Sequence, residues 1–395
     1  MTSYALMNKD KELLDMEMEK GLILSMSNVR KENIKFLPAQ LIPSAGKDPS
    51  FIQLNSWWRT RHIPASRVNL KEILHRLRDQ VSGIEELVEK SLGLSLSDHY
   101  WIRPDPAIKW EDVNFFTNGF SDDVGNLSLK GIIRPVYDLK NPGNTSDGVI
   151  IKRWRIKDGK RFLIKGSGSS LVPQSQPFRE LFVSRLASVF LEGFDFPISP
   201  VVSYNLEMDE GIAYSVCENF VTKDTEYVPF HQIINSDGFE KEKSRSTFEH
   251  VESFYTSYKL LLHGMLLLDH IVLNEDRHFG NFGLMRCVNS GEFLYPAPLF
   301  DFGNSLFYNS LKPNPDTLYC KPFKDSFDDQ LRLIGASRFS DNLHTIRQIL
   351  DDLFEECFRD SFESKDRLNE ILSIIHSRID KIPMENVVTT SIPKE

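Results

Sequence analysis

The feature that most constrains how this chain folds is an apolar stretch, Leu260 to Leu273, that leads directly into a short polar loop at 274–281. The stretch is too short to span a bilayer, and His263, Asp269 and His270 interrupt it. A helix that is apolar on nearly all sides belongs inside a protein core, so the stretch predicts a central buried helix. The polar loop is therefore expected at the end of that helix.

Two carboxylates and a carboxamide in and after this loop have the order that phosphoryl transfer requires. Asp276 and Asn281 lie five positions apart, and Asp301, in an Asp-Phe-Gly sequence, follows twenty residues after Asn281. In D-x-x-x-x-N followed by D-F-G, the first Asp orients and deprotonates the hydroxyl, while the Asn and the second Asp hold Mg²⁺. Taken singly, each is an ordinary loop residue that caps a turn. Together they favour an ATP-dependent kinase.

Two residues upstream fit the same site. The Asp158-Gly159 pair predicts a hairpin whose second strand is 161–166, and a helix is expected at about 176–190. Lys165 lies where a kinase lysine contacts the ATP phosphates, and Glu180, fifteen residues later in the helix, lies where a glutamate orients that lysine. The competing interpretation is a solvated edge lysine and a surface glutamate.

Backbone groups for a nucleotide are expected in two places. The turn at 145–148, with Ser146 and Gly148, is the favoured cover for the phosphates through its N–H groups, although it is not a G-x-G-x-x-G sequence. The glycine-rich segment 166–170 is interpreted as a mobile connector. A strand ends at Glu218-Asn219-Phe220, where a hinge between lobes would present its backbone to an adenine edge.

Arg277 and His278 follow Asp276 directly. Arg277 is a candidate to pair with a carboxylate or to stabilise phosphate charge. For His278 a catalytic base or a metal ligand competes with an anchor that holds the loop by hydrogen bonding, and the anchor is favoured. Both are included in the candidate catalytic set.

The distribution of strand and helix patterns predicts an α+β chain in three parts. Residues 1–125 form an N-terminal region of unknown role, in which the spacing from Met7 to about Met26 predicts a helix. Residues 126–228 read as a small antiparallel sheet with one helix, a kinase N-lobe. Residues 229–395 read as a mostly helical C-lobe.

Composition narrows the class of protein. A net charge of −9 and a pI near 5.7 argue against a dedicated nucleic-acid binder. The four cysteines are scattered and form no CxxC pair, which suits reduced thiols and argues against a zinc site. No signal peptide is visible, so a soluble, cytoplasmic protein without a membrane partner is expected.

The chain resembles the HipA family of serine/threonine kinases, and more closely the HipA-like proteins of Gram-positive bacteria. The segment Asn274-x-Asp276-Arg277-His278-x-x-Asn281-Phe282-Gly283 is similar to that family's catalytic loop, and Leu299-Phe300-Asp301-x-Gly303 to its metal-binding segment. Phe162 to Gly166 resembles its ATP-lysine strand. The resemblance spans most of residues 60–310.

The resemblance implies a two-lobed protein-kinase-like fold that uses ATP and Mg²⁺ to phosphorylate Ser or Thr of a protein. Some members are toxins with a DNA-binding antitoxin, which makes an antitoxin-like partner an expectation, although residues 1–125 depart from the usual N-terminal subdomain. Members also phosphorylate a serine of the phosphate-covering loop, and Ser146 is the matching position.

Two other functions compete with a protein kinase. The same site would serve a kinase for a small molecule or a lipid headgroup, because it accepts any hydroxyl. A nucleotide-binding pseudokinase or interaction module is the non-enzymatic alternative. The weak glycine loop favours the module, whereas the intact Asp276, Asn281 and Asp301 count against it.

Overall fold

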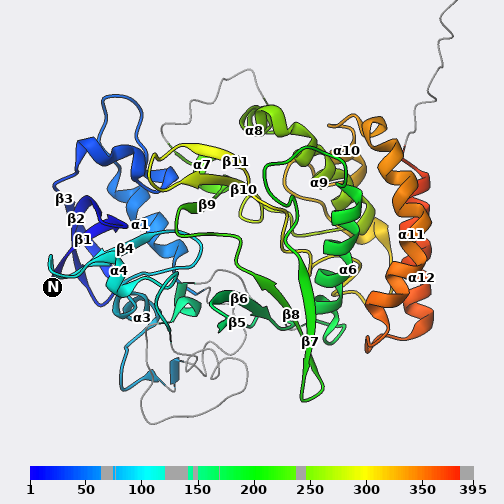
Figure 1. The fold of residues 1–395 in the computed structure, drawn as a ribbon, viewed down its shortest axis with the longest axis horizontal. Helices are drawn as coiled ribbons and strands as arrows, with labels where there is room; N and C mark the ends of the chain where they lie inside the picture. Colours follow the sequence, from blue (N-terminus) through cyan, green and yellow to red (C-terminus); the bar gives the residue numbers. More distant parts are fainter. Residues whose placement is uncertain are drawn as a thin grey trace, which may run out of the picture.

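The computed structural model describes residues 1–63, 74–75, 77–120, 141–145, 150–168, 170–236 and 246–382. Three antiparallel sheets follow one another along the chain, and the C-terminal helices pack at the end opposite the first sheet (Figure 1). In the described part of the chain no helix combines the length and the apolar surface needed to cross a membrane. The predicted boundary at 125 and the candidates Ser146 and Gly148 lie outside the described residues.

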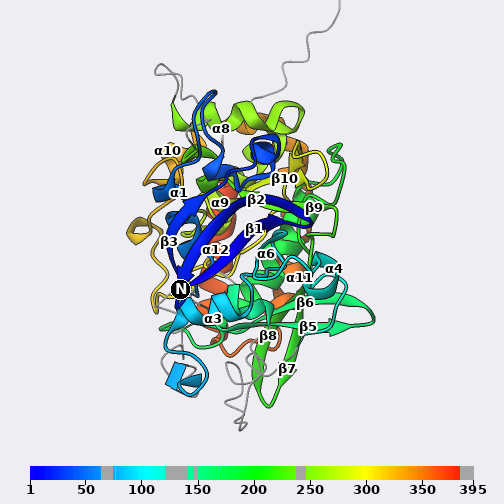
Figure 2. The same ribbon diagram turned by 90° about the vertical axis from the view of Figure 1, so that its left-hand side faces the viewer.

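The N-terminal region is built on a four-stranded sheet in the order β3-β2-β1-β4. Figure 2 shows β3, β2 and β1 side by side. Its strands are β1 (Thr2–Asn8), β2 (Lys11–Glu19), β3 (Leu22–Ser27) and β4 (Tyr100–Arg103). The helix predicted from Met7 to Met26 is therefore wrong. Leu14, Met16 and Met18 are buried at a spacing of two, which is the period of a strand.

Helices cover this first sheet. They are α1 (Phe51–Thr60) and α3 (Ile84–Lys90), and Trp57, Trp58 and Val88 join Leu14 and Met16 in one apolar cluster. A short helix, α4 (Trp110–Val113), follows β4. The remaining short turns are 3₁₀ helices, at Lys31–Phe36, Ala39–Leu41, Pro142–Thr145, Thr256–Tyr258, Pro315–Thr317 and Ala336–Phe339.

The second sheet has the order β5-β6-β8-β7 and carries the predicted lysine strand. Its strands are β5 (Lys152–Lys157), β6 (Lys160–Lys165), β7 (Tyr204–Asp209) and β8 (Ile212–Glu218). The predicted hairpin and the helix after it, α6 (Ser175–Phe190), are confirmed. Because β6 pairs Lys165 with Ser215 of β8, the lysine ends a central strand.

The third sheet has the order β11-β10-β9, and its central strand starts immediately after the polar loop. It consists of β9 (Thr225–Pro229), β10 (Gly283–Cys287) and β11 (Phe293–Pro296). A Cβ on Gly283 would lie 2.2 Å from the carbonyl oxygen of Val228, so only glycine allows β10 to approach β9 this closely. The division of the chain at 125 and 228 stays a prediction.

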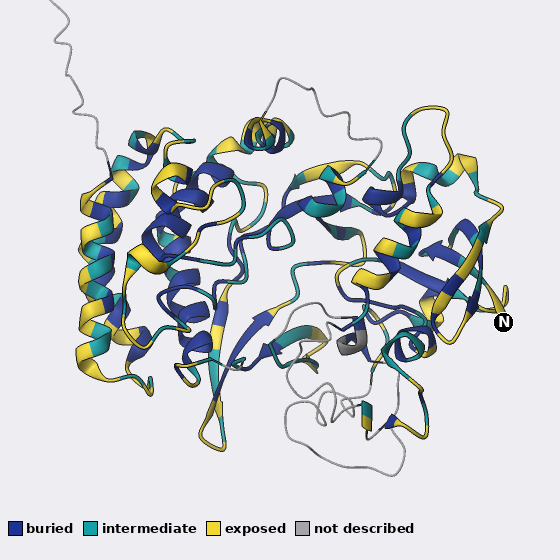
Figure 3. Ribbon diagram, turned by 180° about the vertical axis from the view of Figure 1, so that it is seen from behind, coloured by how far each residue is buried: buried dark blue, intermediate teal, exposed yellow. Residues whose placement is uncertain are grey.

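The apolar stretch forms helix α9 (Lys259–Val272), which is buried almost throughout, as predicted (Figure 3). It shares one core with α6 and the two C-terminal helices, α11 (Ser340–Phe358) and α12 (Lys365–Asp380). The shorter helices α7 (Phe230–Ile234), α8 (Thr247–Tyr255) and α10 (Phe327–Leu331) complete this part. Leu273 ends α9 with a φ of 54°, and this left-handed residue turns the chain into the polar loop.

A buried ion pair within the third sheet presents its arginine to the N-terminal region. Arg286 of β10 donates to Glu226 of β9 at 2.7 Å and to the carbonyl oxygen of Leu37 at 3.1 Å, and it also contacts the hydroxyl of Tyr100. Arg286 and Glu226 are each 1% exposed. The N-terminal region is therefore fastened to the rest of the protein by groups that water does not reach.

Replacing one partner of this pair should destabilise the protein strongly. Glu226→Gln leaves the Arg286 guanidinium buried without its counter-charge, which typically costs about 3–5 kcal/mol. The matched control is Glu356→Gln, which breaks the exposed pair with Arg185 and should cost about 1 kcal/mol or less. Denaturant unfolding measures both. Equal losses of unfolding free energy in the two variants would contradict the buried link.

Candidate active site

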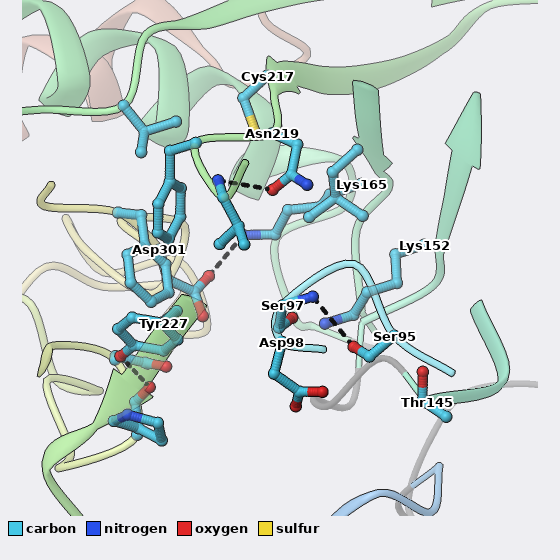
Figure 4. A pocket seen from close by; sticks show the side chains of 18 of the residues that line it. Ser95, Ser97, Asp98, Thr145, Lys152, Lys165, Cys217, Asn219, Tyr227 and Asp301 are labelled. Carbon is cyan, nitrogen blue, oxygen red and sulfur yellow. Dashed lines mark hydrogen bonds and ion pairs between the residues drawn. The ribbon is translucent and has the colours of Figure 1, made fainter. Parts of the chain in front are cut away.

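A cavity of about 450 Å³ lies where the second and third sheets meet the N-terminal region (Figure 4). The second sheet contributes Lys165, the loop after α9 contributes Asp276 and Asn281, and the segment after β11 contributes Asp301. The lining also includes His278, Glu218 and Phe220 from the predicted set. Glu180 and Arg277 do not line the cavity; they hold residues that do.

Lys165 is shared by two carboxylates. Its ammonium contacts Glu180 Oε1 of α6 and lies 2.5 Å from Asp301 Oδ1. The other oxygen of Glu180 accepts a hydrogen bond of 2.8 Å from the backbone N–H of Phe302. The predicted lysine–glutamate pair is therefore formed, and the same glutamate also fixes the backbone next to Asp301.

The three charges of this cluster are unequally buried. Burial lowers the pKa of Lys165, but Asp301 and Glu180 outweigh it and raise that pKa well above its ordinary value. Burial opposes ionisation of Asp301 as well, yet the lysine holds the pKa of this carboxyl well below its usual range. Burial raises the pKa of Glu180, the more deeply buried carboxyl. Lys165 and Asp301 thus carry the charges that face the cavity.

Asp269, in the last turns of α9, organises the polar loop. It accepts hydrogen bonds from Arg277 at 2.9 Å and from Asn274 at 2.9 Å, and all three residues are inaccessible to water. Arg277 also donates to the carbonyl oxygens of Asn281 at 3.0 Å and Phe300 at 2.7 Å. Of the two alternatives for Arg277, the structure thus has the carboxylate pair, and the guanidinium ties the loop to the strand-like run before Asp301.

Asp276 lines the cavity, and its carboxylate is held at both oxygens. Asn304, three residues after Asp301, donates to Oδ2 at 2.9 Å, and the Lys321 ammonium lies 2.9 Å from Oδ1. The backbone N–H of Asp276 donates to Asn274 Oδ1 at 3.1 Å. The carboxylate is accordingly fixed in direction while it remains open to the cavity.

Asn281 and Asp301 form a donor set that suits Mg²⁺. Asn281 uses its amide nitrogen within the loop, donating to the backbone oxygen of Asp276 at 2.9 Å, so its carbonyl oxygen is the atom left to a cation. The side chain of Asp301 is 33% exposed and borders the same cavity. Within the described ranges no three His, Cys, Asp or Glu side chains gather as a metal cage. A cation here would share its ligands with phosphate, as Mg²⁺ commonly does.

His278 has the geometry of a loop anchor. Its Nδ1 accepts a hydrogen bond of 3.0 Å from the backbone N–H of Gly280. A Cβ on Gly280 would lie 2.7 Å from the imidazole, so the glycine gives the ring its space. The ring also lines the cavity. Its hydrogen bond to Gly280 agrees with a role as a loop anchor.

The predicted hinge borders the cavity. Glu218 pairs with Lys160 at 2.8 Å on the exposed side, whereas Phe220 packs against Phe300 with ring centroids 5.5 Å apart. Leu163 and Val202 extend this apolar wall. An apolar wall at the end of a strand suits a planar heterocycle.

Sequence reasoning missed the wall made by the N-terminal region. Ser95, Ser97 and Asp98 line the cavity, and Asp98 pairs with buried Arg61 at 2.8 Å. The backbone N–H of Tyr227 donates to Ser97 O at 3.0 Å, which holds this segment against β9. No local motif marks these residues, because their role follows only from long-range packing. Asn304, by contrast, directly follows Asp301-Phe302-Gly303, and that adjacency was an available signal.

Comparison with known proteins adds a partial relative. No protein-family model matches the chain. The serine/threonine-protein kinase CtkA of Helicobacter pylori is 29% identical over 123 residues, which are 29% of this chain and 36% of that kinase. The match thus spans about a third of the relative's length. The crystal structure of H. pylori CtkA, described as a proinflammatory kinase, aligns at 19% identity and a TM-score of 0.42 over 58% of this chain and 90% of that one.

A solved structure of HipA resembles nearly the whole chain. It comes from a Shewanella oneidensis toxin–antitoxin complex of HipA, HipB and operator DNA. The alignment has 13% identity and a TM-score of 0.56, and it covers 95% of this chain and 96% of that one. At this identity the likeness concerns the fold. The chain has the α+β, two-lobed, HipA-type kinase fold, as its sequence predicted.

Glu275, next to Asp276, gives the site a pH-dependent stability. Burial raises its pKa from the ordinary 4.5 to about 7, with Lys321 acting in the opposite direction and Asp276 adding to the rise. The folded protein therefore binds this proton more tightly than the unfolded chain does. The resulting stabilisation is full below about pH 4.5 and is lost as the pH rises through about 7.

Glu275→Gln removes this titration. The unfolding free energy of wild type minus that of the variant should fall between about pH 4.5 and 7 and level off above. Denaturant unfolding at a series of pH values measures the difference. Glu370→Gln, at an exposed position of α12, is the control and should show a flat difference. A flat difference for Glu275→Gln as well would rule out the raised pKa.

Proposed function

We propose that this protein is an ATP- and Mg²⁺-dependent kinase that transfers the γ-phosphoryl group to a Ser or Thr hydroxyl of a protein. The observation that carries the proposal is the contact of Lys165 with Glu180 and Asp301. It joins three distant segments at one cavity, and Asp276 and Asn281 line that same cavity. If the Lys165 cluster were purely structural, nothing would require Asp276 and Asn281 to line the same cavity.

Each residue has a role that follows from its contacts. Lys165 would bind the ATP phosphates, and Glu180 holds it in place. Asn281 and Asp301 would hold Mg²⁺, which supplies charge neutralisation on the β- and γ-phosphates when bound. Asp276 accepts the proton of the attacking hydroxyl and orients it. Arg277 acts through Asp269, Asn281 and Phe300 as a positioning residue.

The nucleotide base is assigned to the hinge end of the cavity. Leu163, Val202, Phe220 and Phe300 provide apolar surface there, and the backbone of 218–220 would bond the adenine edge. A volume of about 450 Å³ lies in the range of small-molecule pockets. Ser146 and Gly148 are retained as the phosphate cover, since their neighbour Thr145 lines the cavity.

The acceptor class rests on likeness to relatives. CtkA is named a serine/threonine-protein kinase, and HipA crystallised with HipB and DNA; by analogy we extend the proposal to a protein acceptor, to autophosphorylation of Ser146 and to an antitoxin-like partner. The proposal also includes a cytoplasmic location. Direct nucleic-acid binding is not proposed, because the net charge is −9.

One experiment separates a protein kinase from a kinase for small molecules or lipids. The protein is incubated with labelled ATP and either cell lysate or a panel of small hydroxyl compounds and lipids, and the labelled product identifies the class of acceptor.

Two variants test the assignment. Asp276→Ala should lower γ-phosphoryl transfer by about 100-fold or more while leaving Mg·ATP binding nearly intact, because a general base is lost but no nucleotide contact. Asp301→Ala should weaken Mg·ATP binding itself. Labelled ATP with cell lysate measures transfer, and calorimetry measures binding.

Asp360→Ala, at an exposed position after α11, is the matched control and should behave as wild type. Full transfer activity in both site variants would refute the assignment. Mg·ATP binding by a wild type that transfers no phosphoryl group, even to water, would favour the pseudokinase module instead.

A further inference from the structure

Lys321 brings a positive charge to the carboxylate proposed as the catalytic base. Its ammonium lies 2.9 Å from Asp276 Oδ1. The residue comes from the segment between Asp301 and α10, forty-five positions after Asp276. No motif in the sequence marks it, and the roles assigned above do not use it.

The backbone at Lys321 is fixed by a buried side chain. Gln330 of α10, 1% exposed, donates from Nε2 to the carbonyl oxygen of Lys321 at 2.9 Å. The Oε1 of Gln330 accepts from the backbone N–H of Phe323 at 3.1 Å. Both polar atoms of one buried amide are therefore used to position 321–323.

The same segment packs on the polar loop itself. Phe323 meets Phe279 edge to face, with ring centroids 5.7 Å apart, and meets Phe282 at 6.4 Å. Phe279 lies between Asp276 and Asn281 in the chain. Lys321 is thus held against the loop that carries the proposed catalytic residues by aromatic packing as well as by hydrogen bonds.

The side chain of Lys321, unlike its backbone, is free to change partners. It is 49% exposed, and that of Asp276 is 32% exposed. An exposed ion pair of this kind contributes little free energy, so exchanging Asp276 for a phosphate oxygen costs little. Such an exchange needs only rotation about side-chain bonds.

We propose that Lys321 is a further catalytic residue, whose ammonium contacts the γ-phosphoryl group during transfer; this rests on the function proposed above. The acceptor oxygen forms a bond to the γ-phosphorus, the bond to the β–γ bridging oxygen breaks with its electron pair leaving on ADP, and Asp276 takes the hydroxyl proton. The hydroxyl must lie about 3 Å from Asp276 and within about 3.5 Å of the phosphorus. The Lys321 ammonium, which contacts Asp276, is then within reach of the phosphoryl oxygens, where it stabilises the negative charge that develops during transfer.

The test compares Lys321→Met with Lys324→Met, a nearby exposed lysine. Loss of one group that stabilises charge in the transition state lowers kcat by about 100-fold, so Lys321→Met should show this loss with little change in KM for ATP. Lys321→Arg should recover part of the rate, since it restores the charge. The assay is transfer from labelled ATP to lysate protein, with thermal unfolding to show that each variant is folded.

The outcomes separate the inference from the function on which it rests. Equal kcat values for Lys321→Met and Lys324→Met would overturn the role of Lys321 while leaving the kinase intact. A faster Lys321→Met would also overturn it, because the lysine would then only block Asp276. No transfer by wild type, or full transfer by Asp276→Ala in the same assay, would overturn both proposals.

Discussion

The site depends on one ammonium that contacts two carboxylates. Lys165 ends β6, Glu180 comes from α6, and Asp301 follows the run after β11, so the cluster joins the sheet, its helix and the third sheet's connection. Removing Lys165 would leave two neighbouring carboxylates without their counter-charge in a poorly hydrated place, which is strongly destabilising. The same contact that holds these elements together also sets Asp301 beside the cavity in its ionised form.

A second buried pair does the corresponding work for the polar loop. Asp269 and Arg277 are both 0% exposed, and Arg277 reaches the carbonyl oxygens of Asn281 and Phe300. Arg277 thus fixes the position of the loop relative to α9 through Asp269, and relative to Asp301 through Phe300. Asp276 can stay partly open to the cavity because Arg277 holds the backbone of the loop from the buried side.

The sequence predicted those parts of the site that lie close together in the chain or follow a fixed order. The spacing of Asp276 and Asn281, the Asp-Phe-Gly triplet, and the strand–helix order of Lys165 and Glu180 are local signals. The structure brings Lys165, Asp276, Asn281 and Asp301 to one cavity, and Glu180 contacts Lys165 from behind it. Arg277 was placed in the catalytic set but is buried beneath the loop, because adjacency in sequence does not reveal which way a side chain faces.

Long-range packing accounts for what sequence reasoning missed. The N-terminal strands were taken for a helix because Leu13 and Leu14, both buried, blur the alternation that continues at Met16 and Met18. Ser97, Asp98 and Lys321 reach the site only through contacts such as Tyr227 with Ser97 and Gln330 with Lys321.

The central claim is that this cavity binds ATP and Mg²⁺ together, through Lys165, Asn281 and Asp301. Calorimetric titration of the full chain with ATP, with and without Mg²⁺, tests it most directly. We expect a single nucleotide site whose affinity for ATP rises about tenfold or more with Mg²⁺, since the cation links phosphate to protein oxygens. No ATP binding, or binding of equal strength in the presence of a chelator, would contradict it.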